Sequence, residues 1–155
     1  RAAREFVLRV HVVRPFNLLG PGLGPQYFVP SFIAQLRAGG PGPVPVANPA
    51  ATRDWVDARD LADAVVRPAA VPPAAGTAGL FNVATGVETP VLAVAEHLCR
   101  LAGLPPPVAD EPVAGGADRT GIDRSCGDPG RLRAWTGWKP RVGWQESLND
   151  MWADR

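Results

Sequence analysis

The stretch Arg14-Pro-Phe-Asn-Leu-Leu-Gly-Pro-Gly22 follows an apolar, β-branched run over residues 6–13. The run carries apolar residues on both faces, which is typical of an interior strand of a parallel sheet. This strand therefore ends in a polar side chain, Asn17, and in a loop rich in glycine and proline. In open α/β sheets, ligands bind at the carboxyl ends of the strands. The stretch accordingly predicts a binding site around Asn17.

A second informative stretch is Arg53-Asp-Trp-Val-Asp57. The guanidinium of Arg53 offers planar, paired donors that suit a diphosphate. The alternative for Arg53 is a salt bridge to Asp57 or Asp60, and the alternative for Asn17 is capping of a turn. Asp54 and Asp60 could serve as paired carboxylates in acid/base chemistry. Because they flank a step from strand to helix, we expect Asp60 instead to cap or orient the helix and Arg53.

Hydrophobic spacing and turn residues predict alternating strands and helices, which indicates an α/β fold. Pro30 and Gly39 suit the start and the end of the first helix. Thr89 suits an N-cap, with Pro90 as the first helical residue. The predicted strands cover residues 6–13, 44–47, 52–56 and 79–84, and the predicted helices cover residues 28–38, 58–66, 90–102, 129–135 and 144–152.

Several finer expectations follow from the same patterns. Residues 17–26 are expected to form a loop, and residues 69–76 and 105–116 are expected to form irregular connections. On the second helix, the buried side is expected to hold Leu61, Ala62, Val65 and Val66. The strands are too few for a complete doubly wound sheet.

Length and composition limit the class of protein. The 155 residues match one domain, 1–155, with enough apolar residues for a core. A net charge of +1 gives no field that would favour nucleic acid or an anionic membrane, and no apolar run is long enough to span a bilayer. No secretory signal is visible. The expected location is cytoplasmic. Cys99 and Cys126 indicate neither a disulfide framework nor a metal site.

The two stretches around Asn17 and Arg53 together resemble the extended short-chain dehydrogenase/reductase family of nucleotide-sugar epimerases, dehydratases and reductases. Residues 48–55 are similar to those of GDP-mannose 4,6-dehydratases and GDP-4-keto-6-deoxymannose reductases, and the first stretch favours the reductases. Residues 136–140 resemble the family's C-terminal signature, in which Trp138 is expected to pack under the last helix. The resemblance implies the C-terminal part of a Rossmann-like doubly wound sheet plus the small substrate-binding subdomain.

The resemblance also implies roles for individual residues. The family's residue matching Asn17 hydrogen-bonds the sugar nucleotide, and the one matching Arg53 contacts the diphosphate. The backbone of Pro15 and Phe16 is expected to lie against the nicotinamide of NAD(P). Arg119 is a third candidate for the diphosphate, although its spacing to the following Gly-Asp-Pro-Gly segment is one residue out of register.

Two parts of the family's machinery are absent from this sequence. Gly20, Gly22 and Gly24 are followed by Pro25 and not by a helix start, so they do not match a dinucleotide cradle. The family's Tyr-x-x-x-Lys pair is missing, because the only tyrosine, Tyr27, has no lysine four residues later. The chain is therefore expected to be the C-terminal, substrate-binding portion of such an enzyme, without its N-terminal dinucleotide-binding part, with no catalytic residue, and inactive alone.

The implied reaction is hydride transfer between NAD(P) and a GDP-4-keto-6-deoxy sugar. The expected partner is a GDP-linked nucleotide sugar, with no nucleic acid or membrane, and the full-length enzyme is expected to form a homodimer. The alternative is a non-catalytic, truncated fragment that binds a nucleotide sugar or packs against another subunit. Reductase, epimerase and dehydratase chemistry all remain open.

Overall fold

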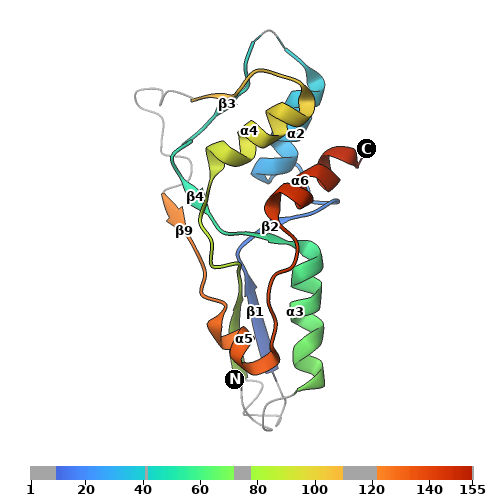
Figure 1. Ribbon diagram of the computed structural model, residues 1–155, viewed down its shortest axis with the longest axis vertical. Coiled ribbons are helices and arrows are strands. Elements are labelled where there is room, and N and C mark those ends of the chain that lie inside the picture. Colours follow the sequence, from blue (N-terminus) through green and yellow to red (C-terminus); the bar gives the residue numbers. More distant parts are fainter. Residues whose placement is uncertain (1–9, 41, 72–77, 110–121, 155) are drawn as a thin grey trace.

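The computed structural model describes residues 10–40, 42–71, 78–109 and 122–154 (Figure 1). Residues 6–9 of the first predicted strand and Arg119 lie outside this part of the chain. The helices are α2 (Phe28–Ala38), α3 (Ala58–Ala70), α4 (Val91–Ala102), α5 (Gly130–Thr136) and α6 (Trp144–Ala153). The strands are β1 (Val10–Pro15), β2 (Asn17–Leu19), β3 (Pro45–Val46), β4 (Thr52–Arg53), β5 (Trp55–Asp57), β6 (Ala78–Val83), β7 (Thr89–Pro90), β8 (Val108–Ala109) and β9 (Arg124–Ser125).

The strands form small sheets in which most neighbours are parallel. The longest pair is β1 with β6, whose register runs from Val10 opposite Ala78 to Pro15 opposite Val83. β2 pairs with β5, and β3 pairs with β8, both in parallel. β4 lies between antiparallel β7 and parallel β9. Helix α3 connects β5 to β6 and packs on β1, so helices and strands alternate as predicted.

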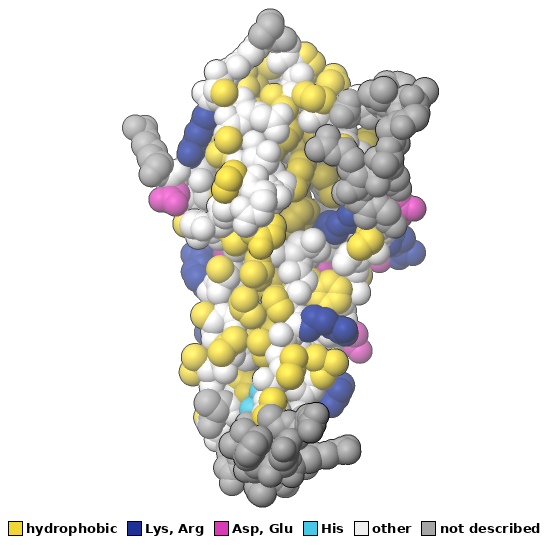
Figure 2. Space-filling view, turned by 180° about the vertical axis from the view of Figure 1, so that it is seen from behind, with side chains coloured by type: hydrophobic (Ala, Val, Ile, Leu, Met, Phe, Trp, Pro, Cys, Tyr) yellow, Lys and Arg dark blue, Asp and Glu magenta, His cyan; other side chains and the backbone are white. Residues whose placement is uncertain are grey.

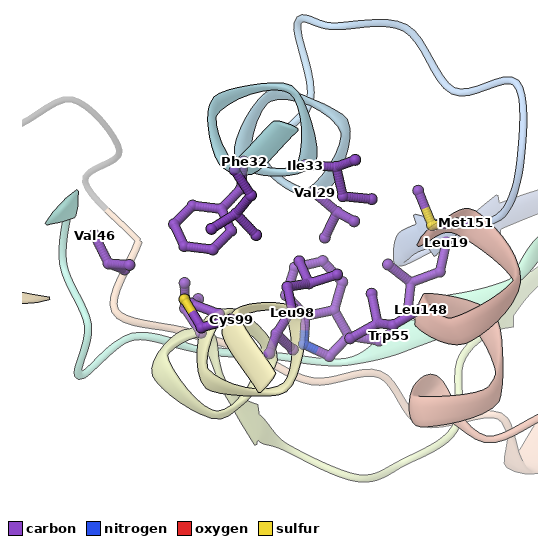
Figure 3. Packing of buried hydrophobic residues seen from close by; sticks show 14 of the residues in the cluster. Leu19, Val29, Phe32, Ile33, Val46, Trp55, Leu98, Cys99, Leu148 and Met151 are labelled. Carbon is purple, nitrogen blue, oxygen red and sulfur yellow. The ribbon is translucent and has the colours of Figure 1, made fainter. Parts of the chain in front are cut away.

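A first hydrophobic cluster lies between α2, α4 and α6. On α4 the buried side chains Val91, Val94, Ala95, Leu98 and Cys99 recur at helical spacing, so they form one apolar stripe. Figure 3 shows Val29, Phe32 and Ile33 of α2 facing this stripe, with Leu148 and Met151 of α6 and Trp55 beside it. The apolar periodicity of these three helices is therefore the cause of the cluster.

A second cluster holds the β1–β6 pair against α3 and α5. Its fully buried members are Val56, Ala64, Val83, Leu132 and Trp138, with Phe81 nearly buried. The indole nitrogen of Trp138 donates to the carbonyl oxygen of Asp60 at 3.0 Å. The expectation that Trp138 packs under the last helix is therefore wrong, because its ring is buried with residues of α3 and α5.

The predicted buried side of α3 is also wrong in part. Ala62 is exposed, and the side chains of Val65 and Val66 are 52% and 69% exposed. The buried side carries Asp60 and Ala64, one turn apart. Asp60 faces inward because its carboxylate accepts hydrogen bonds from backbone N–H groups of residues 141 and 142. The spacing of apolar residues could not predict the buried face of α3, because the hydrogen bonds of the Asp60 carboxylate determine which face points inward.

Several elements also differ from the predictions, since β8 lies within residues 105–116, which were expected to be irregular, and β9 was not predicted. Asn17–Leu19, expected in a loop, forms β2 because β5 supplies its hydrogen-bond partners. Helix α3 continues past residue 66 to Ala70, and it includes Pro68 in its last turn, where the missing N–H costs one helical bond. Thr89–Pro90 forms β7 opposite β4, so α4 begins at Val91 and Thr89 does not cap it.

Leu98 gives a direct test of the first cluster. Leu98→Ala removes a fully buried side chain from the contact between α4 and α2, and it should lower the free energy of unfolding by about 2–5 kcal/mol. Leu104→Ala, at a side chain that is 41% exposed just beyond α4, is the matched control and should cost much less. Equal losses in urea denaturation would contradict this description of the core.

Candidate functional site

A cavity of about 500 Å³ lies beside the first cluster. Its walls come from β2, β5, the start of α2 and the segment that leads into β4. Most of the lining is apolar or aromatic. The lining residues are Pro15, Phe16, Asn17, Leu18, Leu23, Tyr27, Phe28, Val29, Pro30, Ala47, Asn48, Ala51, Arg53, Trp55 and Val91.

The structure brings Asn17 and Arg53 to this same cavity. The parallel pairing of β2 with β5 sets Asn17 opposite Trp55, and Arg53 lies two residues before that point. Arg53 donates through Nη1 to the carbonyl oxygens of Thr52 at 2.8 Å and Asp123 at 3.5 Å. Both partners are neutral, so the guanidinium charge is not balanced by a carboxylate among the described residues.

The alternative salt bridge from Arg53 to Asp57 or Asp60 is wrong. Asp57 binds the side chain of Arg59 at 2.8 and 2.9 Å. Asp60 accepts from the backbone N–H groups of Arg141 and Val142, at 3.0–3.1 Å. The expectation that Asp60 caps the helix or orients Arg53 is wrong as well, because Asp57 is the residue that caps α3.

Asn17 is held by the residue next to Arg53. Its backbone N–H and its side-chain Nδ2 both donate to the carbonyl oxygen of Asp54, at 3.0 and 3.2 Å. The side chain therefore does not cap a turn, which was its alternative role. An Asn side chain also has an acceptor, Oδ1, and no described residue donates to it here. Pro15 and Phe16 precede Asn17 on the same wall.

Asp54 contributes a buried carboxylate behind the cavity wall. Oδ1 accepts from the backbone N–H and the hydroxyl of Thr85, at 2.8 and 2.7 Å. Oδ2 accepts from the backbone N–H of Gly86 at 2.9 Å and of Gly127 at 3.2 Å. Asp54 was only a weak candidate for acid/base chemistry, although a charged residue with strand residues on both sides is a signal for a buried carboxylate.

Gly127 allows the 126–127 segment to lie against the cavity wall. A Cβ atom at this position would lie 2.4 Å from a ring carbon of Phe16 and 2.5 Å from the Cβ of Ala84. Only a residue without a side chain fits there. Cys126 beside it is a free thiol, and burial raises its pKa, as does the nearby carboxylate of Asp54.

Asp57 caps the N-terminus of α3 and joins that helix to α6. It accepts from the backbone N–H of Arg59 at 2.7 Å and from the hydroxyl of Ser147 at 2.5 Å. Burial by itself raises the pKa of this carboxyl. The hydrogen bonds from Arg59 and Ser147 together outweigh burial and hold the pKa of Asp57 below its usual range.

Tyr27, Asn48 and Trp55 line the cavity but were not predicted as site residues. Asn48 has a positive φ of 47°, which asparagine tolerates better than most residues. An asparagine in a predicted turn is therefore a sequence signal that could have pointed to this position. Tyr27 directly precedes α2 and is 54% exposed. Arg119 lies outside the described residues, so its part in the site stays a prediction.

Comparison with known proteins places the chain in a family. Residues 1–84 match the NAD dependent epimerase/dehydratase family. The chain belongs to this family. None of the described helices is both long enough and apolar enough to cross a bilayer.

Relatives of this epimerase/dehydratase chain include GDP-6-deoxy-D-mannose reductase of Pseudomonas aeruginosa, which is 30% identical over 151 residues, covering 94% of this chain and 48% of the relative. The structure of RMD from Pseudomonas aeruginosa complexed with NADPH has a TM-score of 0.82 and 27% identity, covering 99% of this chain and 50% of that one. The structure of UDP-glucose 4-epimerase with UDP-glucose from Thermotoga maritima has a TM-score of 0.76 and 26% identity. The match covers 97% of this chain and 47% of that one.

The chain thus spans about half the length of the relatives that it matches. These likenesses confirm the predicted family and the Rossmann-like α/β fold. The family is described as NAD dependent, and RMD from Pseudomonas aeruginosa was solved with NADPH.

The depressed pKa of Asp57 predicts a pH dependence of stability. In the unfolded chain an Asp titrates near pH 4, and in the folded chain it titrates lower. Its contribution is therefore complete above about pH 4 and is lost as the pH falls through the folded pKa. The free energy of unfolding should fall as the pH is lowered below about 4, and Asp57→Asn should flatten this fall.

Ser147→Ala removes one of the donors to Asp57, and it should partly reduce the same acid-induced fall in the free energy of unfolding. Urea denaturation at several pH values measures both effects. An unchanged slope in Asp57→Asn would show that this carboxylate does not contribute to acid sensitivity.

Proposed function

We propose that this chain is the nucleotide-sugar-binding portion of an NAD(P)-dependent enzyme that reduces, epimerises or dehydrates a nucleotide sugar. The observation that carries the proposal is the shared cavity of Asn17 and Arg53, which are 36 residues apart in the sequence. A guanidinium without a described carboxylate partner suits a diphosphate, and an amide suits sugar hydroxyls. The apolar lining suits the flat face of a base or a ring.

A GDP-4-keto-6-deoxy sugar is the substrate that we favour. Support comes from the likeness to GDP-6-deoxy-D-mannose reductase, which extends over 94% of the chain. The motif around Asn17 favours the same class. In this proposal Arg53 binds the diphosphate, Asn17 orients the sugar, and Arg119 adds a second cation near the phosphates.

The residues present fit one end of NAD(P). Pro15 and Phe16 form an apolar part of the cavity wall, which suits the face of a nicotinamide ring. Among the described glycines, the run at 20–24 is followed by a loop and not directly by a helix, so it does not form a pyrophosphate cradle. When bound, the nicotinamide supplies or accepts a hydride. The part of this chain is to hold the nucleotide sugar beside that ring and to keep water from it.

The second candidate is a chain that binds a nucleotide sugar without catalysis, or that packs against another subunit. α3 and α5 cover one face of the β1–β6 pair, while Val12 and Leu80 alternate to the other face, where they are 49% and 43% exposed. Figure 2, which views the molecule from behind, shows a band of hydrophobic side chains along its length. Such a surface favours a contact with further protein, including a second copy in a homodimer.

Arg53 provides the main test of the binding proposal. Arg53→Ala should weaken the binding of GDP-mannose by roughly 1.5–3 kcal/mol, the value of a hydrogen bond to a charged group, or about ten- to a hundredfold in Kd. Arg53→Lys should restore little, because an ammonium cannot make the planar fork. Isothermal titration calorimetry measures each Kd.

Arg100→Ala, in the last turn of α4 and away from the cavity lining, is the matched control and should bind normally. Equal affinities for the unchanged chain and Arg53→Ala would remove Arg53 from the site. Binding of UDP-glucose as tight as that of GDP-mannose would reject the preference for GDP.

The chain alone should show no oxidoreductase turnover. The described cavity has only two titratable side chains, Arg53 and Tyr27, and the sequence contains no Tyr-x-x-x-Lys pair to move a proton. Incubation with NADPH and a GDP-4-keto-6-deoxy sugar, followed by the absorbance of reduced nicotinamide, tests this. Protein-dependent oxidation would overturn the assignment of a purely binding role.

A further inference from the structure

Asp54 lies between two residues of the cavity but does not line it. Its neighbours Arg53 and Trp55 both contribute to the lining, and its own side chain is fully buried. Its carboxylate joins segments that are far apart in the sequence, namely the Thr85–Gly86 turn and Gly127. Its backbone carbonyl oxygen accepts from the backbone N–H and from the side-chain Nδ2 of Asn17. One residue therefore connects the strand carrying Arg53 with three other parts of the chain.

The surroundings of this carboxylate are selective for an acceptor with two oxygens. Each oxygen accepts two hydrogen bonds from N–H or O–H donors. Three of the donors are the backbone N–H groups of Thr85, Gly86 and Gly127. A backbone N–H can only donate, so each of them needs an acceptor. An amide would point an NH₂ group at one pair of these donors, and buried donors would lose their partners.

The same residue is fixed on its backbone side. The N–H of Asp54 donates to the carbonyl oxygen of Ser125 at 2.8 Å. The β4 strand just before it pairs with β9 on one side and with β7 on the other. The peptide units on either side of Asp54 therefore set both the direction of the Arg53 side chain and the position of the Asn17 amide.

From this geometry we propose that Asp54 is a positioning residue for the Asn17–Arg53 pair. Its carboxylate fixes the peptide units on both sides of itself, so that the guanidinium of Arg53 and the amide of Asn17 meet one ligand at the same time. Asp54 does not touch the ligand. This inference rests on the proposed function, because it assumes that the cavity binds a nucleotide sugar through Asn17 and Arg53.

The test is a double-mutant cycle on GDP-mannose binding by the full 155-residue chain. In the unchanged chain, Arg53→Ala should raise the Kd at least tenfold. Asp54→Asn should raise the Kd at least tenfold as well. In the Asp54→Asn background, adding Arg53→Ala should raise the Kd less than threefold, because Arg53 is no longer held in place to bind.

Asp60→Asn is the matched control. Asp60 is also buried and also accepts backbone N–H donors, but it lies on α3 and does not neighbour a cavity residue. In this background Arg53→Ala should keep its full, at least tenfold, effect. A role of Asp54 in stability alone would make the two backgrounds behave alike, which would overturn the proposal, as would an unchanged Kd in Asp54→Asn.

A milder variant covers the case in which Asp54→Asn does not fold. Thr85→Val removes the hydroxyl donor at 2.7 Å and leaves the backbone donors to Asp54 in place. It should raise the Kd for GDP-mannose severalfold and reduce the effect of Arg53→Ala, and full additivity with Arg53→Ala would overturn the proposal. If Arg53→Ala has no effect in the unchanged chain, the proposed function fails instead, independently of Asp54.

Discussion

The parallel pairing of β2 with β5 is the contact on which both halves of the molecule depend. All three residues of β5 are buried, and successive side chains point to opposite sides of a strand. Trp55 therefore packs in the cluster of α2, α4 and α6, whereas Val56 packs in the cluster of α3 and α5. Asp57 then begins α3 and binds Ser147 of α6. The strand β5 thereby links the two cores, together with its neighbour β2, whose Leu19 packs in the first cluster and whose Leu18 packs against the second.

The cavity is a consequence of this link. β2 continues from the long β1–β6 pair toward the first cluster (Figure 1). Residues of the first turn of α2 line the cavity beside it. The cavity therefore lies where the strands end and the helices of the first cluster begin. Residues from distant parts of the sequence meet at such a place, which explains why a cation, two amides and four aromatic side chains line the cavity.

The described cavity offers one positive charge and two amides, which are groups suited to binding. Arg53 supplies positive charge, and the amides of Asn17 and Asn48 supply directed hydrogen bonds. The carboxylates of the strand-to-helix step are used elsewhere, since Asp54 holds backbone segments and Asp57 caps a helix. This division of roles agrees with our proposal that the chain binds a nucleotide sugar, as does the family match over residues 1–84.

The sequence by itself predicted the five helices, the strands around β1, β3, β4–β5 and β6, and the family, and it singled out Asn17 and Arg53 as candidate binding residues. These follow from local signals: apolar spacing on α2, α4 and α6, Gly103 at the end of α4, and the polar side chain after an apolar strand. Only the tertiary structure decided the partners of the charged residues. Asp60 anchors a distant backbone segment, Trp138 is buried beneath α3, and residues 17–19 become a strand, because each depends on donors, acceptors or surfaces supplied from far along the chain. Hydrophobic periodicity records which residues avoid water, but it does not record which polar groups meet when the chain folds.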